Sequence, residues 1–152
     1  MLELPHMLIG AAIATSIGNP LLSLPLALGS HFVADLVPHW NPHIYRETKK
    51  YGKPTRRSTV IIIVDSTLSL GLGLFIASQA LPDVSKALIM LAACLLAVLP
   101  DVVEAPFFYF GVKPEWMIRL INWQRKLQVN APLLPGLAIQ LVVVIVATWL
   151  IF

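Results

Sequence analysis

The stretch MLIGAAIATSIGNPLLSLPLALGSHFVADL, Met7 to Leu36, decides the fold because it has the pattern of two apolar helices joined by a turn. Met7 to Ile17 supplies about 11 apolar residues, roughly 16 Å of helix, which is about half the hydrocarbon thickness of a bilayer. Gly18 to Pro20 is a turn signal, and Leu21 to Leu36 then continues helically for about 16 residues. We expect a hairpin that enters and leaves on one side. Such backbone is tolerated at membrane depth only where protein covers it or a wet cavity lies alongside.

The composition of the whole chain is that of an integral membrane protein. The chain has 152 residues, of which 57 % are hydrophobic and 12 % charged, and its mean hydropathy is +0.78. A soluble domain carries roughly a quarter of charged residues. The length allows a single integral membrane domain, residues 1–152, with no separate soluble catalytic domain. No phosphate-binding glycine loop, nucleophile elbow, paired-cysteine motif or nucleic-acid module is visible, and Cys94 is alone.

The remaining segments predict an all-α polytopic protein. It has the N-terminal helical hairpin, three further membrane helices and one interfacial amphipathic helix. The expected membrane helices cover Ser58–Ala80, Lys86–Phe110 and Pro132–Phe152, and the interfacial helix covers Lys113–Gln128. Pro100 is expected to bend the second of these membrane helices.

Two further expectations concern small residues and the start of the chain. Gly71 and Gly73 are expected to allow close contact between helices, since small residues populate membrane helix interfaces. The start, MLELPHMLIG, lacks a basic region and carries Glu3, so we expect it to stay in the mature protein rather than act as a signal peptide.

The loop IYRETKKYGKPTRRS is strongly basic. By the positive-inside rule, loops 44–57 and 111–131 are expected in the cytoplasm. The loop has two interpretations, a solvated topology signal that attracts anionic lipid headgroups and a phosphate-binding patch, and we favour the first. The expected headgroup-contacting residues are Arg46, Lys49, Lys50, Arg56 and Arg57.

Ionisable residues inside the apolar segments are the main functional signal. An intramembrane ionisable group costs several kcal/mol, so it is usually paired, lines a cavity or has a function. His31, Asp35 and His39 follow one another at four-residue steps. His31 and Asp35 therefore share a helix face, and His39 lies nearer the surface. His43 lies beyond the helix-ending Asn-Pro and is the weakest member of the series.

Carboxylates from two other segments reach a comparable depth. Asp101 and Glu104 are spaced i and i+3 on one helix, and Asp65 lies roughly 10 Å from the cytoplasmic end of another. His6, at the mouth of the hairpin, returns to the same layer. Neutral imidazoles together with carboxylates suit zinc or manganese.

Two interpretations of these polar residues stay open. Asp65 alone has a structural alternative, in which it accepts hydrogen bonds from Ser66 or Thr67 or pairs with Lys86. The whole set, which has no Lys or Arg inside the spans to neutralise it, favours a bound cation over a purely hydrogen-bonded network.

The motifs PHMLIGAAIA, GSHFVADLVPHW and LAVLPD resemble those of small membrane-bound metal-dependent hydrolases of bacteria and archaea. The element made by His31 and Asp35 is also similar to one in zinc-dependent phospholipase C, where imidazoles and carboxylates hold a zinc cluster. The resemblance covers roughly residues 5 to 105. The chain departs from it in having no histidine after His43, where many such hydrolases have a second cluster.

The residues and the resemblance together lead to a functional expectation. We expect a metal-dependent hydrolase of a phospholipid or a lipid-linked phosphoester, with zinc (or manganese) as cofactor and membrane lipids as partners. The expected metal ligands are His6, His31, Asp35, His39 and Asp101, and the expected general base is Glu104 or Asp65. The alternatives are a non-enzymatic protein with a structural metal or polar core, in a homo-oligomer, and an ion or proton pathway.

Overall fold

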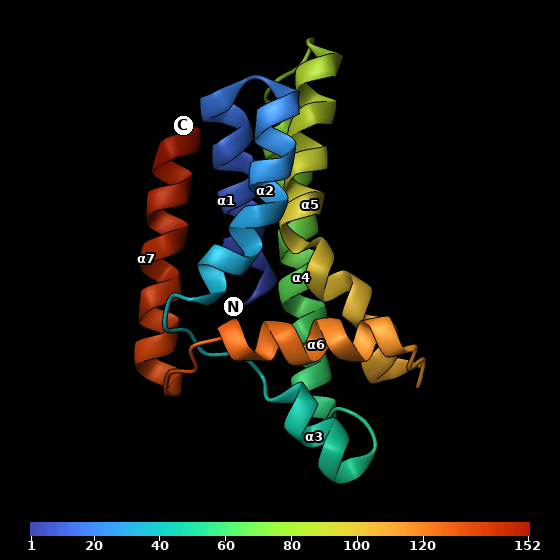
Figure 1. The fold of residues 1–152 in the computed structure, drawn as a ribbon. Helices are drawn as coiled ribbons and strands as arrows, with labels where there is room; N and C mark the ends of the chain where they lie inside the picture. Colours follow the sequence, from blue (N-terminus) through green and yellow to red (C-terminus); the bar gives the residue numbers. More distant parts are fainter.

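The computed structural model describes residues 1–152 as seven helices without a β-sheet (Figure 1). The helices are α1 (Glu3–Ile17), α2 (Pro20–Asp35), α3 (Ile44–Tyr51), α4 (Arg56–Ser78), α5 (Val84–Tyr109), α6 (Glu115–Leu127) and α7 (Leu133–Ile151). Three of them, α4, α5 and α7, are long and apolar enough to cross a membrane. The predicted all-α class, with its hairpin, three membrane helices and additional amphipathic helix, is confirmed.

Helix α1 forms the centre of the bundle. It packs against α2, α4, α5 and α7, and its apolar side chains show no preferred face. A helix that is hydrophobic all round is typically buried on all sides. The main core cluster accordingly joins Met7, Leu8 and Ala11 of α1 to Ile76 of α4 and Met90 of α5.

Helices α1 and α2 form the expected hairpin. Gly18 ends α1 with a φ of 65°, a conformation in which glycine has no steric penalty. The Asn19 side chain then accepts a hydrogen bond from the Leu21 N–H (3.0 Å) and so caps α2. Gly18 and Asp83 line one small cavity, so the hairpin turn lies beside the α4–α5 connection. The start of α1 and the end of α2 lie at the other end of the bundle (Figure 1).

Helix α5 changes direction in its second half (Figure 1). Pro100 and Pro106 both lie inside this helix. A proline lacks the N–H that would close the helical hydrogen bond and its ring crowds the preceding turn, which bends the helix. The bend carries Asp101 and Glu104 beneath the open end of the hairpin.

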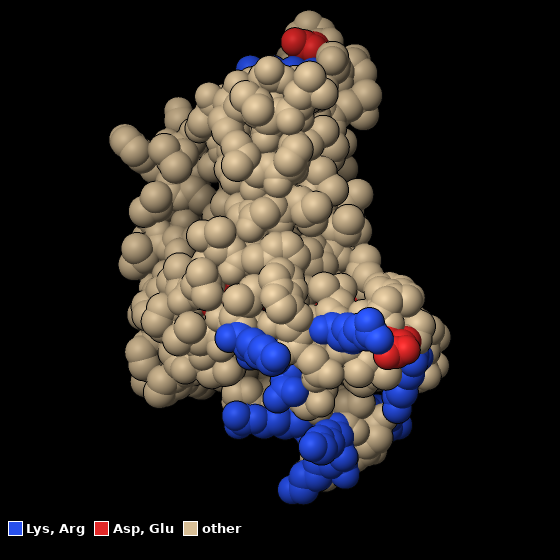
Figure 2. Space-filling view, in the orientation of Figure 1, with Lys and Arg blue, Asp and Glu red and all other residues tan.

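The end of the bundle that lies away from the hairpin turn is made by α3, α6 and the first turn of α4. It is called the basic end. Figure 2 shows Lys and Arg side chains gathered there, below a face without them. Helix α6 lies across the bundle axis at this end, as expected of the interfacial helix (Figure 1), and its Trp123 packs on Phe32 of α2 with ring centroids 4.8 Å apart. The segment expected to be only a loop contains the short helix α3, which the sequence analysis did not predict.

A single acidic side chain fastens α3 to the start of α4. The Glu47 carboxylate accepts hydrogen bonds from the Thr55 N–H (2.8 Å) and the Ser58 hydroxyl (2.8 Å). Partial burial raises the pKa of Glu47, but these hydrogen bonds to the charged form outweigh that effect, so the pKa lies below its ordinary value.

We expect this fastening to be pH-dependent. Because the folded pKa of Glu47 is lowered, its stabilising effect is present at neutral pH and is lost as the pH falls through the folded pKa. Glu47→Gln should therefore lower the melting temperature of the detergent-purified protein at pH 7. The difference from wild type should shrink in acid, and a difference independent of pH would contradict this role of the carboxylate.

Glycines at two positions allow close helix contact. A Cβ at Gly10 would lie 2.6 Å from the Ala93 carbonyl oxygen and 2.8 Å from the Ala97 Cβ, so α1 and α5 touch there. A Cβ at Gly73 of α4 would lie 3.4 Å from Met7 Sδ of α1, so these two helices approach each other there, as expected. Gly71, in contrast, has no atom within 4 Å of its Cβ position, so the expectation that it supports a helix contact is wrong.

We predict that Gly10→Ala destabilises the protein by about 1–3 kcal/mol, because the added methyl group must push apart two backbones. Gly71→Ala is the matched control. It adds the same methyl group in open space and should leave stability unchanged or raise it by up to about 1 kcal/mol. Unfolding of both variants in the same detergent measures the difference, and equal stability of the two would contradict the contact.

Candidate metal centre

The open end of the hairpin brings together all five side chains that the sequence analysis expected to bind a metal. His6 comes from α1, His31 and Asp35 from α2, His39 from the segment after α2, and Asp101 from α5. The three imidazoles and Asp35 are at most 1 % exposed, and the Asp101 side chain is 22 % exposed.

Asp35 lies at the centre of this cluster. Its carboxylate oxygens lie 3.4 Å from His6 Nε2, 3.8 Å from His31 Nε2 and 3.7 Å from His39 Nε2. The second carboxylate, Asp101, approaches His31 Nε2 at 3.6 Å. These separations are longer than hydrogen bonds, so the nitrogen atoms face the carboxylates without being bonded to them.

Backbone carbonyls fix the tautomers of two histidines. His31 Nδ1 lies 2.8 Å from the Ala97 carbonyl oxygen, and His39 Nδ1 lies 2.7 Å from that of Val37. A carbonyl oxygen can only accept, so each Nδ1 carries the proton and donates it. In the neutral imidazole each Nε2 therefore presents a lone pair, and both Nε2 atoms are buried without a hydrogen-bond partner. Histidines that bind metals are held in this way.

His6 completes the nitrogen side of the cluster. Its ring stacks on that of His31 with centroids 4.1 Å apart and an interplanar angle of 19°. Ligand atoms of His6, His31 and Asp101 all lie within 4.8 Å of one another. This buried group is close enough to hold a metal ion.

A positive charge already lies within the cluster. The amine nitrogen of Met1 contacts Asp35 Oδ1 and lies 3.2 Å from His6 Nε2. The Asp35 carboxylate is thus paired at one of its oxygens.

Two glutamines contact the two carboxylates of the cluster, which sequence reasoning missed: Gln124 lies in α6, and Gln128 directly follows its last turn. Gln124 Nε2 donates to Asp101 Oδ1 and Gln128 Nε2 donates to Asp35 Oδ2, each at 3.3 Å. The two glutamines are four residues apart and therefore share one helix face. Only this spacing in the segment NWQRKLQ could have indicated them, and glutamine is common on any amphipathic helix.

Hydrogen bonds from two other segments hold the segment around His39 in place. The His39 N–H donates to the Val129 carbonyl (3.0 Å), and the His39 carbonyl accepts from the Ala131 N–H (2.8 Å). On the other side, Gln140 of α7 donates to the Trp40 carbonyl at 2.9 Å and accepts from the Leu2 N–H at 2.8 Å. The one strongly polar side chain of the last span therefore connects His39's segment to the start of the chain.

Asp65 lies beside the cluster but is already hydrogen-bonded. Its carboxylate accepts from the Glu3 N–H (2.6 Å) and the Leu4 N–H (3.3 Å), and so caps the start of α1. The sequence analysis considered other structural partners for it, Ser66, Thr67 and Lys86. The observed partners come from another helix, which spacing along α4 does not indicate.

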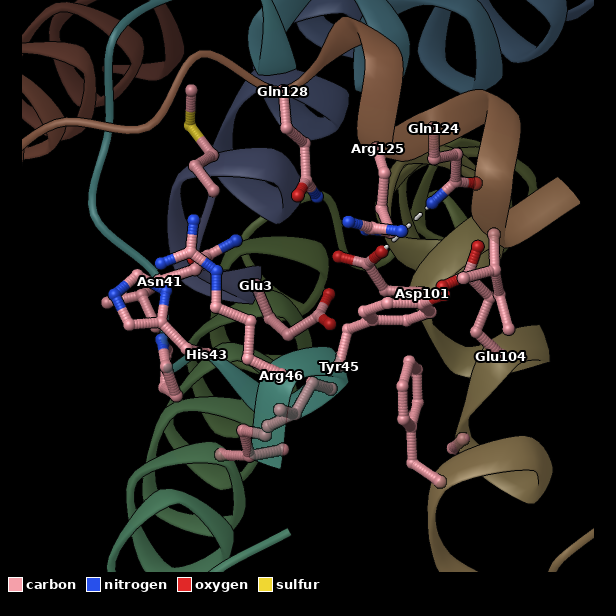
Figure 3. Close-up of a pocket in the computed structure, with 18 of the residues that line it drawn as sticks. Glu3, Asn41, His43, Tyr45, Arg46, Asp101, Glu104, Gln124, Arg125 and Gln128 are labelled. Carbon is pink, nitrogen blue, oxygen red and sulfur yellow. Dashed lines mark hydrogen bonds between the residues drawn. The ribbon is translucent and has the colours of Figure 1, made fainter. Parts of the chain in front are cut away.

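A cavity of about 200 Å³ opens next to the cluster, between α3, α5, α6 and the start of α1 (Figure 3). Its wall includes the carboxylates of Glu3, Asp65, Asp101 and Glu104. Glu104 is 7 % exposed and its Oε1 has no hydrogen-bond partner. The cavity therefore connects solvent at the basic end to Asp101 in the cluster.

The expected headgroup residues divide into two groups. Arg46 lines the cavity, whereas Lys49, Lys50, Arg56 and Arg57 are exposed on α3 and the start of α4 and do not line it. His43 also lines the cavity but takes no part in the histidine cluster.

A scan of the chain against protein-family models gives no match, and searches for similar curated proteins and solved structures give none either. The chemistry of the site is therefore the basis for a functional proposal.

We predict that the α6 glutamines support metal binding through the carboxylates. Gln124→Ala with Gln128→Ala should lower metal affinity about 10- to 100-fold, the usual effect of removing groups that orient ligands. Asn122→Ala, an exposed change on the same helix, is the control and should have no effect. Titration of the purified protein with zinc in competition with a chelator measures all three, and unchanged affinity in the double variant would contradict the prediction.

Proposed function

We propose that this protein is a membrane-embedded, metal-dependent hydrolase of a phosphoester in a phospholipid or a lipid-linked substrate. The observation that carries the proposal is the pair of buried, unpartnered Nε2 atoms of His31 and His39. Both face Asp35, and both are fixed in the metal-binding tautomer by backbone carbonyls.

The donor set fits a divalent cation of borderline softness. His6, His31 and Asp101 offer the mixed nitrogen and oxygen ligands of zinc, with Asp35 and His39 beside them, and manganese is the second candidate. The Met1 amine lies near His6 Nε2, but the Nε2 atoms of His31 and His39 have no hydrogen-bond partner. A bound cation supplies polarisation of a phosphoryl oxygen and activation of water near neutral pH.

The other polar residues then take distinct roles. Glu104 has a free carboxylate oxygen on the cavity wall and is the candidate general base that removes a proton from the attacking water. Asp65 is the weaker candidate for this role because its carboxylate caps α1. Gln124 and Gln128 hold the carboxylates Asp101 and Asp35 in position.

Phospholipid is the proposed substrate class because of where the cavity opens. It opens at the basic end, among exposed Lys and Arg side chains (Figure 2) that attract anionic headgroups. By the positive-inside rule we infer that the basic end faces the cytoplasm, so that the reaction would occur at the cytoplasmic leaflet.

Elemental analysis of the detergent-purified protein tests the proposal. Wild type should carry zinc or manganese near stoichiometrically, and a His31→Ala, Asp35→Ala double variant should lose it. The same preparations should differ in release of headgroup phosphate from phospholipid in mixed micelles. Absence of metal from wild type, or hydrolysis unchanged in the variant, would contradict the proposal.

A second candidate function is a non-enzymatic polar core, in a homo-oligomer or along an ion pathway. The contact of the Met1 amine with Asp35 and the capping contacts of Asp65 favour it, because they show that part of the cluster is satisfied by the chain itself. This candidate predicts that the double variant loses stability without any change in metal content.

A further inference from the structure

The cavity beside the cluster contains an unusual concentration of unsatisfied hydrogen-bond acceptors. Glu3 Oε2, Asn41 Oδ1, Glu104 Oε1 and Gln124 Oε1 are all buried, have no partner, and belong to residues that line this one cavity. A buried polar atom without a partner is costly, and most native side-chain polar atoms have one. Gln124 is only 2 % exposed, so these atoms need a donor that enters the cavity.

The same cavity carries two cations that have no acidic partner. Arg46 and Arg125 line it, and neither forms an ion pair, although four carboxylates share the wall. Figure 3 shows both guanidinium groups projecting into the space between α3 and α6. Arg125 is held there by stacking on the Tyr45 ring, 3.6 Å from its centroid. A stacked guanidinium keeps its N–H groups free, and their planar arrangement matches a phosphate.

We propose that this cavity binds a phosphate ester whose alcohol part carries a hydrogen-bond donor. The donor that fits best is a primary ammonium, as in a phosphoethanolamine headgroup. The arginines bind the phosphate oxygens. The donors of the alcohol part reach the carboxylates of Glu104 and Glu3 and the amide oxygen of Gln124. The two carboxylates favour an ammonium over a neutral hydroxyl.

This inference rests on the proposed function, because it names the substrate class of the proposed hydrolase site. The binding itself does not require the metal. A quaternary ammonium such as choline has the same charge but no N–H, so it leaves the buried acceptors unpartnered. Sites with buried polar groups reject ligands that lack the matching group more strongly than they reject a change in size.

The test is equilibrium binding of phosphoethanolamine and phosphocholine to the detergent-purified wild-type protein by calorimetry. We expect phosphoethanolamine to bind at least about tenfold more tightly, the effect of one charge-assisted hydrogen bond. Inorganic phosphate alone should bind more weakly than phosphoethanolamine. Equal affinity for the two esters overturns the proposal without any variant being made.

Two variants locate the binding. Arg125→Gln should weaken binding of both esters about tenfold, and Glu104→Gln should reduce the preference for phosphoethanolamine while phosphate binding remains. Arg119→Gln is the matched control, because Arg119 is on the same helix, pairs with Glu115 in solvent and does not line the cavity. Affinity unchanged in Arg125→Gln overturns the assignment of the phosphate to this cavity.

Nanodiscs of phosphatidylethanolamine or phosphatidylcholine separate the two sources of the headgroup. Protein released from mixed nanodiscs and weighed by native mass spectrometry should retain phosphatidylethanolamine if a lipid is the ligand. Retention of neither lipid, with phosphoethanolamine still bound, identifies a soluble ester. The metal content of the same samples tests the proposed function separately. Headgroup binding without metal would contradict the proposed function alone, and metal without headgroup binding would contradict this inference alone.

Discussion

The structure depends on one constraint, the need of every charged group placed within the bundle to find a partner there. Five carboxylates and three imidazoles gather where the hairpin opens, and lipid cannot satisfy them there. The surrounding helices meet this need in specific ways. The backbone carbonyls of Val37 and Ala97 orient two of the histidines, and the first amides of α1 satisfy Asp65. Gln124 in α6 and Gln128 at its end contact the two aspartates of the cluster.

Much of this fold could be predicted from the sequence because it rests on local signals. Gly18 to Pro20 between two apolar runs indicates the hairpin, and uninterrupted hydropathy indicates α4, α5 and α7. The four-residue spacing of His31 and Asp35 predicted one face of the cluster, whereas His39 lies beyond the end of α2 and is held by its bridge to Asn130. The depth of Asp101, counted along its own helix, was sufficient to bring it to the same layer.

The features that could not be predicted depend on contacts distant in sequence. Helix α3 is short and highly charged, and it is stabilised by hydrogen bonds from Thr55 and Ser58 to Glu47. The contribution of Gln124 and Gln128 depends on which face α6 turns inward, which its mixed sequence leaves open. Glu3 attracted notice only as a charge near the start of the chain, and its place on the cavity wall follows from the way Asp65 holds the first turn of α1.

The order of the cluster along the chain has a consequence for biogenesis. The three histidines and Asp35 all precede residue 40, whereas Asp101 and the α6 glutamines follow much later, Gln128 being 93 positions after Asp35. During synthesis the hairpin therefore emerges with its polar end incomplete. The polar end of the hairpin obtains its remaining partners only when α5, α6 and Gln128 have been synthesised, so late segments of the chain complete a site that its first segments begin.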